Sequence, residues 1–422
     1  MILCLGAMSL TFFFNIDKRW ELEGWGITAA NLMLLYLLFI FLRTFIIVLL
    51  SFLEYLFFKK VESPSYHPLV TILVPSFNEQ EVIANAISSL KKIQYPNMEI
   101  LVIDDGSFDM TTSIAKEFED KDQLRVIYKE NEGKAEALNR GINEALGEYV
   151  LCMDADSILK EDVLLRAMAY FEKSPDLSAV AGRVEIGNSH NLLLKFQQLE
   201  YVTGLNLFKR AQSLLGAVTI VPGPIGVFRK SSLKEIGLYD ADTFAEDTDL
   251  TLRLLTEGHR IKYCPEMVAV TEGPDNFQQL LTQRYRWSRG MLQAILKNAK
   301  WLNPFKNNWR NFGIISYMVL ETVIIPTVNF SFALLTLQFA LSYGTNNILG
   351  AYFIGLTLLD LILSLFSMIT ERELKGYFLL SLINRVTYGF SLEIIRFFSL
   401  IDELFGIPMK WGTLQRKGMG AQ

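Results

Sequence analysis

The sequence predicts an α/β domain with a mostly parallel β-sheet, flanked by transmembrane helices. Hydrophobic residues make up 51% of the 422 residues, and the mean hydropathy is +0.26, which is high for a soluble protein. Apolar residues gather toward the two ends of the chain, whereas most charged residues lie between Lys59 and Arg310. Within that charged region strand-like and helix-like segments alternate, a pattern typical of a doubly wound sheet.

The first 58 residues are predicted to hold the N-terminal transmembrane helices. The stretch from Ile27 to Phe58 is nearly all apolar and is long enough to cross a bilayer. Lys59 and Lys60 follow it, so the positive-inside rule places that end in the cytoplasm. The shorter apolar run from Met1 to Phe14 is either a first, short membrane helix or a signal-peptide core. We favour the helix because no basic segment precedes the run and no small-residue cleavage site follows it.

Residues 59–275 are predicted to form the α/β domain, which we place in the cytoplasm. Short runs rich in apolar and β-branched residues predict the strands, and helical spacing of apolar residues predicts the helices between them. The predicted strands are Leu69–Pro75, Glu99–Ile103, Leu124–Tyr128 and Tyr149–Met153, and the predicted helices are Glu79–Leu90, Asp109–Glu119 and Gly133–Leu146. Their alternation predicts that the sheet is mostly parallel.

The rest of the chain is divided into an interfacial region, 276–311, and a C-terminal transmembrane region with a tail, 312–422. Pro326 interrupts an apolar run, which is either one kinked helix or an interfacial piece followed by a span. A charged loop over Glu371–Lys375 precedes the last candidate, which contains Arg385, Glu393 and Arg396. These charges face either a protein interior or the membrane surface. The three candidate spans are Phe312–Tyr343, Leu349–Thr370 and Gly376–Ile401.

Polar residues follow three of the predicted strands: Ser76 to Glu79, Asp104-Asp105, and Asp154-Ala155-Asp156. Ligands of such sheets bind beyond the carboxyl ends of the strands. Asp154 and Asp156 lie two positions apart, so in extended backbone their side chains share a face. Carboxylate oxygens suit Mg²⁺ or Mn²⁺. The alternative is a plain turn after the strand, since Asp favours turns.

Asp104-Asp105 has the same two interpretations: a turn completed by Gly106, or an acceptor for a base or ribose. Glu246 and Asp247 precede a leucine-rich helix. They either cap that helix, where negative charge is favourable, or supply a general base, for which Asp247 is the candidate.

The segment Gln283-Arg284-Tyr285-Arg286-Trp287 lies in a helical stretch. Its two arginines suit a pyrophosphate, and its tryptophan offers a flat face to a sugar ring. The alternative is a basic amphipathic helix at the membrane surface, and both roles are compatible.

Several classes of function are disfavoured. No glycine-rich dinucleotide loop or P-loop is present, so neither a redox cofactor nor ATP hydrolysis is indicated. The formal net charge of −5 gives no sign of nucleic-acid binding. Cys4, Cys152 and Cys264 are far apart, which is no disulfide framework or metal motif and fits a reduced, cytosolic domain.

Taken in order, these motifs resemble the processive family-2 glycosyltransferases, such as cellulose, chitin, hyaluronan and poly-N-acetylglucosamine synthases. The resemblance runs from about Val70 to Leu296 and implies a GT-A-like, Rossmann-like fold. It rests on the aspartate pair, the DxD triplet, a TED-like triplet and QxxRW, in that order. Ala245 departs from the pattern, where Thr or Gly is usual, but the carboxylate at Asp247 is kept. The segment around Gly133 and Asn139 looks closest to the poly-N-acetylglucosamine synthases.

The resemblance implies a role for each matching residue. Asp247 would be the catalytic base, with Glu246 beside it, and Asp156, with Asp154, would bind Mg²⁺ or Mn²⁺. The segment from Pro222 to Arg229 looks like an acceptor pocket. The substrate-binding residues implied are Pro75, Ser76, Glu79, Asp104, Asp105, Lys134, Asp154, Gly223, Arg229, Gln283, Arg284, Arg286 and Trp287. Among them, Asp104 and Asp105 would contact uracil and ribose, Lys134 the nucleotide, and Gln283, Arg286 and Trp287 the diphosphate and the acceptor end.

The expected function is a processive, inverting synthase of the plasma membrane. It would transfer a sugar from a UDP-sugar, with N-acetylglucosamine the best candidate, to a growing glycan that leaves through the membrane. A hyaluronan, chitin or other β-glycan synthase is an alternative, as are a transferase acting on a lipid-linked acceptor and a transporter with a nucleotide-binding regulatory domain. Membrane lipid is an expected partner, and a small accessory membrane subunit is a further expectation.

Overall fold

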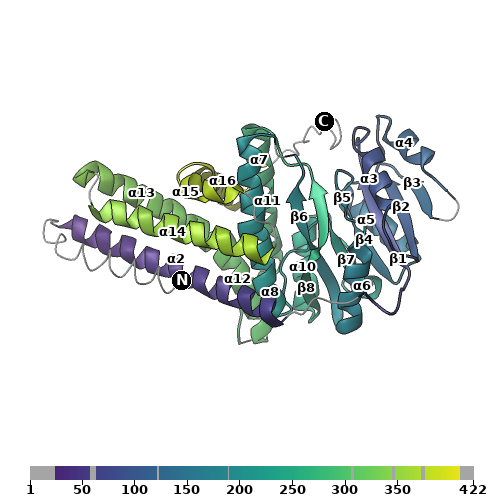
Figure 1. Ribbon diagram of the computed structural model, residues 1–422, viewed down its shortest axis with the longest axis horizontal. Helices are drawn as coiled ribbons and strands as arrows, with labels where there is room; N and C mark the ends of the chain where they lie inside the picture. The colour runs from purple at the N-terminus through teal and green to yellow at the C-terminus, as the bar shows by residue number, and fades with distance from the viewer. Residues whose placement is uncertain are drawn as a thin grey trace.

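A computed structural model describes residues 24–57, 63–120, 123–188, 190–305, 308–344, 347–371 and 376–408. One β-sheet with helices on both faces forms one end of the molecule, and a bundle of long helices extends from the other (Figure 1). Helices α7 (Leu192–Glu200), α8 (Leu207–Leu214) and α11 (Phe277–Lys297) lie between the bundle and the sheet. The expected membrane helix at Met1–Phe14 and the predicted cytoplasmic Lys59 and Lys60 lie outside the described residues.

The sheet has eight strands in the order β3-β2-β1-β4-β7-β6-β8-β5. As predicted, the first four strands pair in parallel. The second half is mixed: β6 and β8 are parallel, but β7 runs antiparallel to both β4 and β6, and β5 is antiparallel to β8. The strands are β1 Val70–Ser76, β2 Met98–Asp104, β3 Leu124–Tyr128, β4 Tyr149–Cys152, β5 Ile158–Leu159, β6 Leu177–Ile186, β7 Gly226–Arg229 and β8 Arg260–Thr271.

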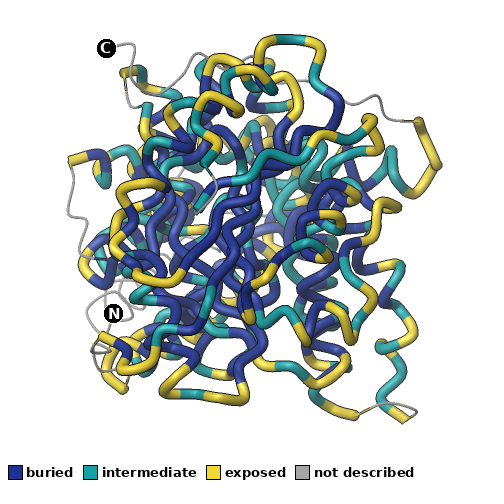
Figure 2. The backbone as a smooth tube through the Cα atoms, turned by 90° about the vertical axis from the view of Figure 1, so that its right-hand side faces the viewer, coloured by how far each residue is buried: buried dark blue, intermediate teal, exposed yellow. Residues whose placement is uncertain are grey.

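The central strands are buried on both faces, because each face is covered by helices (Figure 2). Alternate residues of β1 enter opposite apolar clusters: Ile72 packs with Ile83 of α3, whereas Leu73 packs with Leu138 of α5. That two-sided burial explains the nearly continuous apolar runs of the strands. The covering helices are α3 Ile83–Leu90, α4 Thr111–Glu117, α5 Lys134–Glu144, α6 Val163–Lys173, α9 Lys230–Glu235 and α10 Glu246–Thr256.

Within the described residues, three helices are long and apolar enough to cross a membrane. They are α2 (Trp25–Phe57), the stretch Trp309–Tyr343, and α14 (Asn347–Thr370). The second is one helix rather than an interfacial piece plus a span. It consists of α12 (Trp309–Val319), a π-helical turn η4 (Leu320–Ile324) and α13 (Ile325–Tyr343). Pro326 lies in the first turn of α13, so its missing N–H explains why the regular bonding breaks just before it.

The last predicted span is a bent pair of helical segments. The stretch Gly376–Asn384, formed by η5 (Gly376–Leu380) and α15 (Ser381–Asn384), meets α16 (Tyr388–Leu404) at an angle of 56°. If each bent pair is one span, the described residues hold up to four spans.

The charges in this last segment are paired inside the bundle. Arg385 donates to both carboxylate oxygens of Asp360, at 2.9 and 2.7 Å. Arg396 lies 3.2 Å from Glu393. Of the two interpretations left open by the sequence, these contacts favour the protein interior.

A buried ion-pair network joins the bundle to the sheet domain. Arg210 of α8 contacts Glu54 of α2 at 2.8 Å and Glu371, just after α14, also at 2.8 Å. Tyr263 of β8 donates a 2.9 Å hydrogen bond to the same Glu371. Glu371, which the sequence assigns to a charged loop, is therefore a buried anchor, and residues 372–375 lie outside the described residues.

Candidate active site

The polar groups that follow β1, β2 and β4 meet at one edge of the sheet. Ser76 at the end of β1 pairs in register with Asp104 at the end of β2, and Leu73 of β1 pairs with Cys152 of β4. Parallel pairing brings these carboxyl ends together, so the predicted clustering at this edge is confirmed.

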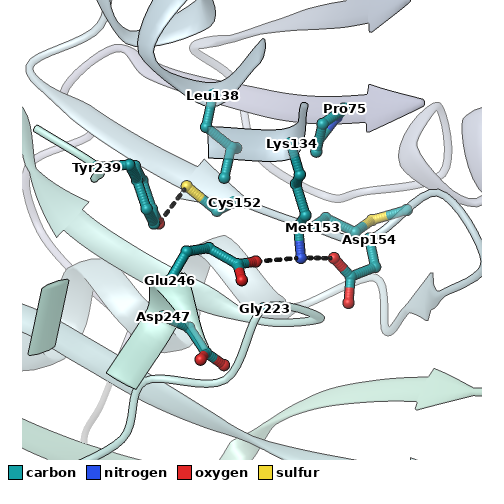
Figure 3. Close-up of a pocket in the computed structure, with 10 residues that line it drawn as sticks. All are labelled: Pro75, Lys134, Leu138, Cys152, Met153, Asp154, Gly223, Tyr239, Glu246 and Asp247. Atoms are coloured by element: carbon teal, nitrogen blue, oxygen red, sulfur yellow. Dashed lines mark hydrogen bonds and ion pairs between the residues drawn. The ribbon is translucent and has the colours of Figure 1, made fainter. Parts of the chain in front are cut away.

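A pocket opens at this edge, and Figure 3 shows the side chains around it. Lys134, at the start of α5, points between the carboxylates of Asp154 and Glu246. Asp247 lies beside them. The pocket is lined by Pro75, Lys134, Leu138, Cys152, Met153, Asp154, Gly223, Tyr239, Glu246 and Asp247.

The Lys134 ammonium bridges two acidic motifs that lie far apart in the sequence. Its Nζ is 2.7 Å from Asp154 Oδ1 and 2.9 Å from Glu246 Oε1. Burial alone would lower the pKa of Lys134, but the two carboxylates hold that pKa above its ordinary value. Lys134 is therefore a fixed positive charge in the pocket.

Gly223 lets this ion pair form. A Cβ atom at Gly223 would stand 3.0 Å from Lys134 Nζ and 3.2 Å from either carboxylate oxygen of Asp154. Any larger residue would therefore crowd both partners.

Glu246 and Asp247 form the first turn of α10, and Ala245 is the N-cap residue. No side chain caps this helix end, and Glu246 turns to Lys134 instead. Asp247 Oδ1 accepts a 2.7 Å hydrogen bond from the N–H of Thr248. Burial, and then the negative charge of Glu246, raise the pKa of Asp247 to about 6. A carboxylate with that pKa is ionised at neutral pH and still basic enough to accept a proton.

Asp104 and Asp105 are buried, and their carboxylates accept hydrogen bonds from other groups of the protein. Asp104 accepts from Ser107 N at 2.9 Å and from the Thr112 hydroxyl. Asp105 accepts from Lys129 Nζ at 2.6 Å and from Gly133 N at 2.8 Å. The pair thus shapes two loops at the pocket edge, and its contact with a base or ribose stays a prediction.

The remaining residues of the β1 edge are close to that aspartate pair. The Ser76 side chain is buried, and its backbone carbonyl accepts from Asp105 N at 2.9 Å. Glu79 N donates to the Thr111 hydroxyl at 2.7 Å. Substrate contacts of Ser76 and Glu79 stay predictions.

Asp156 is buried and accepts a 3.1 Å hydrogen bond from Ser157 Oγ. Asp154 is half-buried and faces the pocket. Two hard oxygen donors after one strand are of the chemistry that Mg²⁺ or Mn²⁺ requires. The residues present therefore fit a divalent cation, with nucleotide oxygens and water needed to complete its coordination.

The QRYRW segment lies in α11, and its two arginines differ. Arg284 is buried and forms a two-pronged pair with Glu200, so the expectation that it binds pyrophosphate is not supported. Its Nη1 also donates to Gln283. Arg286 and Trp287 are only half-buried, and the Arg284 guanidinium lies 4.2 Å from the Trp287 ring centre. Substrate contacts of Gln283, Arg286 and Trp287 stay predictions.

Arg229 is not brought to the pocket, which corrects its assignment to substrate binding. It is the last residue of β7 and pairs in register with Tyr149, the first residue of β4. It lies over the Tyr149 ring and contacts Glu148 Oε1 at 3.1 Å. Because β7 is antiparallel to β4, its end lies at the edge of the sheet away from Asp154.

A second acidic cluster lies outside the pocket. Asp240, Asp242 and Asp249 bring their carboxylates together, but Lys297 Nζ contacts all three, at 2.6, 2.8 and 3.2 Å. An ammonium group already lies among these carboxylates, and Arg253 also pairs with Asp249 at 2.9 Å, so we assign the cluster a structural role.

Sequence reasoning missed four pocket residues and one supporting carboxylate. Leu138, Cys152, Met153 and Tyr239 line the pocket but look like ordinary core residues. Burial raises the pKa of the Cys152 thiol to about 11, so this cysteine is no thiolate nucleophile. Glu200 could have been noticed in the sequence, because it is the only acidic residue in the Leu192–Glu200 helix.

Comparison with known proteins agrees with this architecture. The model of glycosyl transferase family 2 matches residues 71–237. Poly-beta-1,6-N-acetyl-D-glucosamine synthases of Staphylococcus epidermidis and of Staphylococcus aureus strain COL are each 36% identical over 230 residues. These residues are 54% of this chain and 56% of the relative, so the chain spans about half the length of the curated relatives it matches.

A solved structure shares the fold. The mannosyltransferase of Pyrobaculum calidifontis, solved with GDP-mannose and Mn²⁺, superposes with a TM-score of 0.64, covering 91% of this chain and 99% of its own. At 19% sequence identity this likeness concerns the fold alone, and it supports the GT-A-like assignment. The match to the glycosyl transferase family 2 model covers residues 71–237, which contain the aspartate pair, Lys134 and the DxD triplet.

Proposed function

We propose that the chain is a processive, inverting glycosyltransferase that adds N-acetylglucosamine from UDP-N-acetylglucosamine to a growing polymer. The observation that carries the proposal is the shared pocket of Asp247, Lys134 and Asp154, which places a basic carboxylate beside a fixed cation and the DxD triplet. The choice of sugar is supported by the relatives, which are named for poly-N-acetylglucosamine synthesis.

Asp247 is the proposed general base. Its carboxylate accepts the proton of the acceptor hydroxyl as that oxygen attacks the anomeric carbon, and the bond to UDP breaks on the opposite side. A single displacement of this kind inverts the anomeric configuration. Glu246 keeps Lys134 in place beside Asp247, and its negative charge contributes to the raised pKa of the base.

The chain's cations and aromatic groups hold the donor and the acceptor. Lys134 and Arg286 are the proposed partners of the diphosphate, whose charge suits fixed ammonium and guanidinium groups. Trp287, with Gln283, holds the acceptor end. The uridine is bound by the residues at the ends of β1 and β2, which are Pro75, Ser76, Asp104 and Asp105. Glu79 follows β1, and its N–H is bonded to the Thr111 hydroxyl, which follows β2.

A divalent cation, Mg²⁺ or Mn²⁺, is proposed at Asp156 and Asp154. When bound, it would neutralise charge on the departing diphosphate. Asp154 would then contact both the cation and Lys134, whose Nζ lies 2.7 Å from Asp154 Oδ1.

The proposed location is the plasma membrane, with several spans and a cytoplasmic catalytic domain. The support is the set of long apolar helices on both sides of the sheet domain in the sequence and the basic Lys59 and Lys60 after the first of them. The polymer would leave through these helices, in contact with membrane lipid, and a small accessory membrane subunit is a further proposed partner.

The test is an assay of the purified, full-length chain with a panel of UDP-sugars. We expect Mg²⁺- or Mn²⁺-dependent release of UDP from UDP-N-acetylglucosamine and a long polymer on a sizing gel. A single added sugar would indicate a transferase with a lipid-linked acceptor, and use of UDP-glucuronic acid as well would indicate a hyaluronan-type product. Absence of UDP release from every donor would overturn the proposal.

A further inference from the structure

We infer that Glu200 is a positioning residue that fixes the sugar-binding side of α11 by holding Arg284 against Trp287. The inference rests on the proposed function, in which Trp287 holds the acceptor. Glu200 is the last residue of α7 and lies within residues 71–237, which match the family model.

Glu200 and Arg284 form a fork-to-fork pair. Arg284 Nε lies 3.1 Å from Glu200 Oε1, and Arg284 Nη2 lies 2.7 Å from Oε2. The Arg284 side chain is 2% exposed and the Glu200 side chain 13%. Burial would raise the pKa of Glu200, but Arg284 and the other donors hold that pKa below its ordinary value. The pair therefore stays charged, with both guanidinium prongs fixed.

The guanidinium held in this way lies on the indole ring. Its central carbon is 4.2 Å from the Trp287 ring centre and 5.9 Å from that of Tyr201. Arg284 and Trp287 are three positions apart on α11, so they lie on adjoining turns of one helix face. A planar guanidinium over an aromatic ring restricts where that ring can lie.

The same carboxylate also receives groups from the C-terminal helix α16. The Tyr388 hydroxyl donates to Glu200 Oε2, and Arg396 lies 3.6 Å from Oε1. A π-helical turn, η2 (Tyr201–Asn206), begins at the residue after Glu200. One carboxylate therefore joins α7, α11 and α16 beside the proposed acceptor site.

A purely structural role of the Glu200–Arg284 pair and a positioning role of Glu200 predict different results. Removing one buried partner leaves the other charge uncompensated, whereas removing both leaves none. The double variant Glu200→Gln with Arg284→Gln should thus recover much of the stability that either single variant loses. It still lacks the guanidinium over Trp287, so a positioning role predicts that acceptor use does not recover with stability.

The experiment compares the wild type with E200Q, R284Q and E200Q/R284Q as full-length, purified chains. Thermal stability, the KM for UDP-N-acetylglucosamine and the KM for a soluble N-acetylglucosamine oligosaccharide are measured. We expect near-wild-type melting of the double variant, a donor KM within about twofold of wild type, and an acceptor KM raised roughly tenfold. Recovery of the acceptor KM together with stability would overturn the inference.

Two further variants keep the test decisive if the double variant fails to fold. R284K retains a cation for Glu200 but loses the planar group over Trp287, so we expect a stable protein with the same raised acceptor KM. Wild-type kinetics of R284K would contradict the inference. Y388F removes the α16 hydroxyl while leaving the Glu200–Arg284 pair, so we expect little change in acceptor KM. A Y388F effect equal to that of E200Q would also contradict it. Failure of the wild type itself to use UDP-N-acetylglucosamine would instead count against the proposed function.

Discussion

Gly290 of α11 lies directly against Ala245, the residue that precedes the acidic pair at the start of α10. A Cβ atom on Gly290 would stand 2.6 Å from both the Cβ and the backbone nitrogen of Ala245. The helix that carries Trp287 and the segment that carries Asp247 are thus fixed to one another by close contact. The contact also accounts for a small residue at 245, where the sequence departs from the pattern of the family it resembles.

Replacing Gly290 by alanine should destabilise the protein, because its new methyl group meets backbone rather than the end of a flexible side chain. Overpacking of this kind typically costs about 1–3 kcal/mol, and the displaced Asp247 should lower kcat. Thermal unfolding and UDP release measure the two effects. The second-site change A245G removes the Cβ contact but not the backbone contact, so it should rescue only in part. Wild-type stability of G290A would contradict this packing.

Gly223→Ala should weaken donor use more than it affects folding. The added methyl group would press on Lys134 Nζ and Asp154, which must move by a few tenths of an ångström. We expect kcat/KM for the donor to fall about tenfold, less than the roughly hundredfold loss that a 1 Å misplacement can cause. Gly313→Ala is the matched control, since a Cβ there meets nothing within 4 Å. Equal kinetics of the two variants would be evidence against the Lys134–Asp154 pairing.

The rate should depend on the ionisation of Asp247, whose pKa burial and Glu246 raise to about 6. A general base works only when deprotonated, so kcat/KM should be constant above that pH and fall about tenfold per pH unit below it. The Lys134 cation lowers the pKa of Asp247. In K134Q the acid limb should therefore shift to higher pH. A pH–rate profile of both proteins checks this, and an unshifted or downshifted limb in K134Q would refute it.

Arg229→Gln should leave catalysis unchanged, because Arg229 lies away from the pocket and pairs with Glu148. Loss of that partly exposed pair and of its contact with Tyr149 should cost about 1 kcal/mol or less. Denaturant unfolding and steady-state kinetics with the donor are the measurements. A large rise in KM with unchanged stability would restore the substrate-binding role expected from the sequence.

The first half of the sheet could be predicted because each step depends on local pattern. Strand and helix alternate from β1 to β4, and parallel pairing then places the ends of these strands at one edge. The antiparallel insertion of β7 could not be predicted, since strand direction is set by pairing with β4 and β6 across the sheet. That reversal is why Gly223 reaches the pocket and Arg229 does not.

The different roles of the two arginines in the QRYRW segment also could not be predicted from the sequence. From sequence, Arg284 and Arg286 are equivalent candidates for a pyrophosphate. Their difference comes from Glu200, a residue 84 positions away that takes up Arg284. The bridge from Lys134 to Glu246 likewise joins two motifs separated by more than 100 residues, and only the folded chain brings them together.

The assignment of chemistry to Asp247 is tested most directly by Asp247→Asn in the full-length protein. Asparagine keeps the size of the side chain but cannot take up the proton of the acceptor hydroxyl. We predict donor binding close to wild type and a rate of UDP release lower by about 10²- to 10⁴-fold. Asp242→Asn is the matched control, because this exposed carboxylate contacts Lys297 outside the pocket, and it should keep wild-type activity. Polymer synthesis by Asp247→Asn at the wild-type rate would contradict the account.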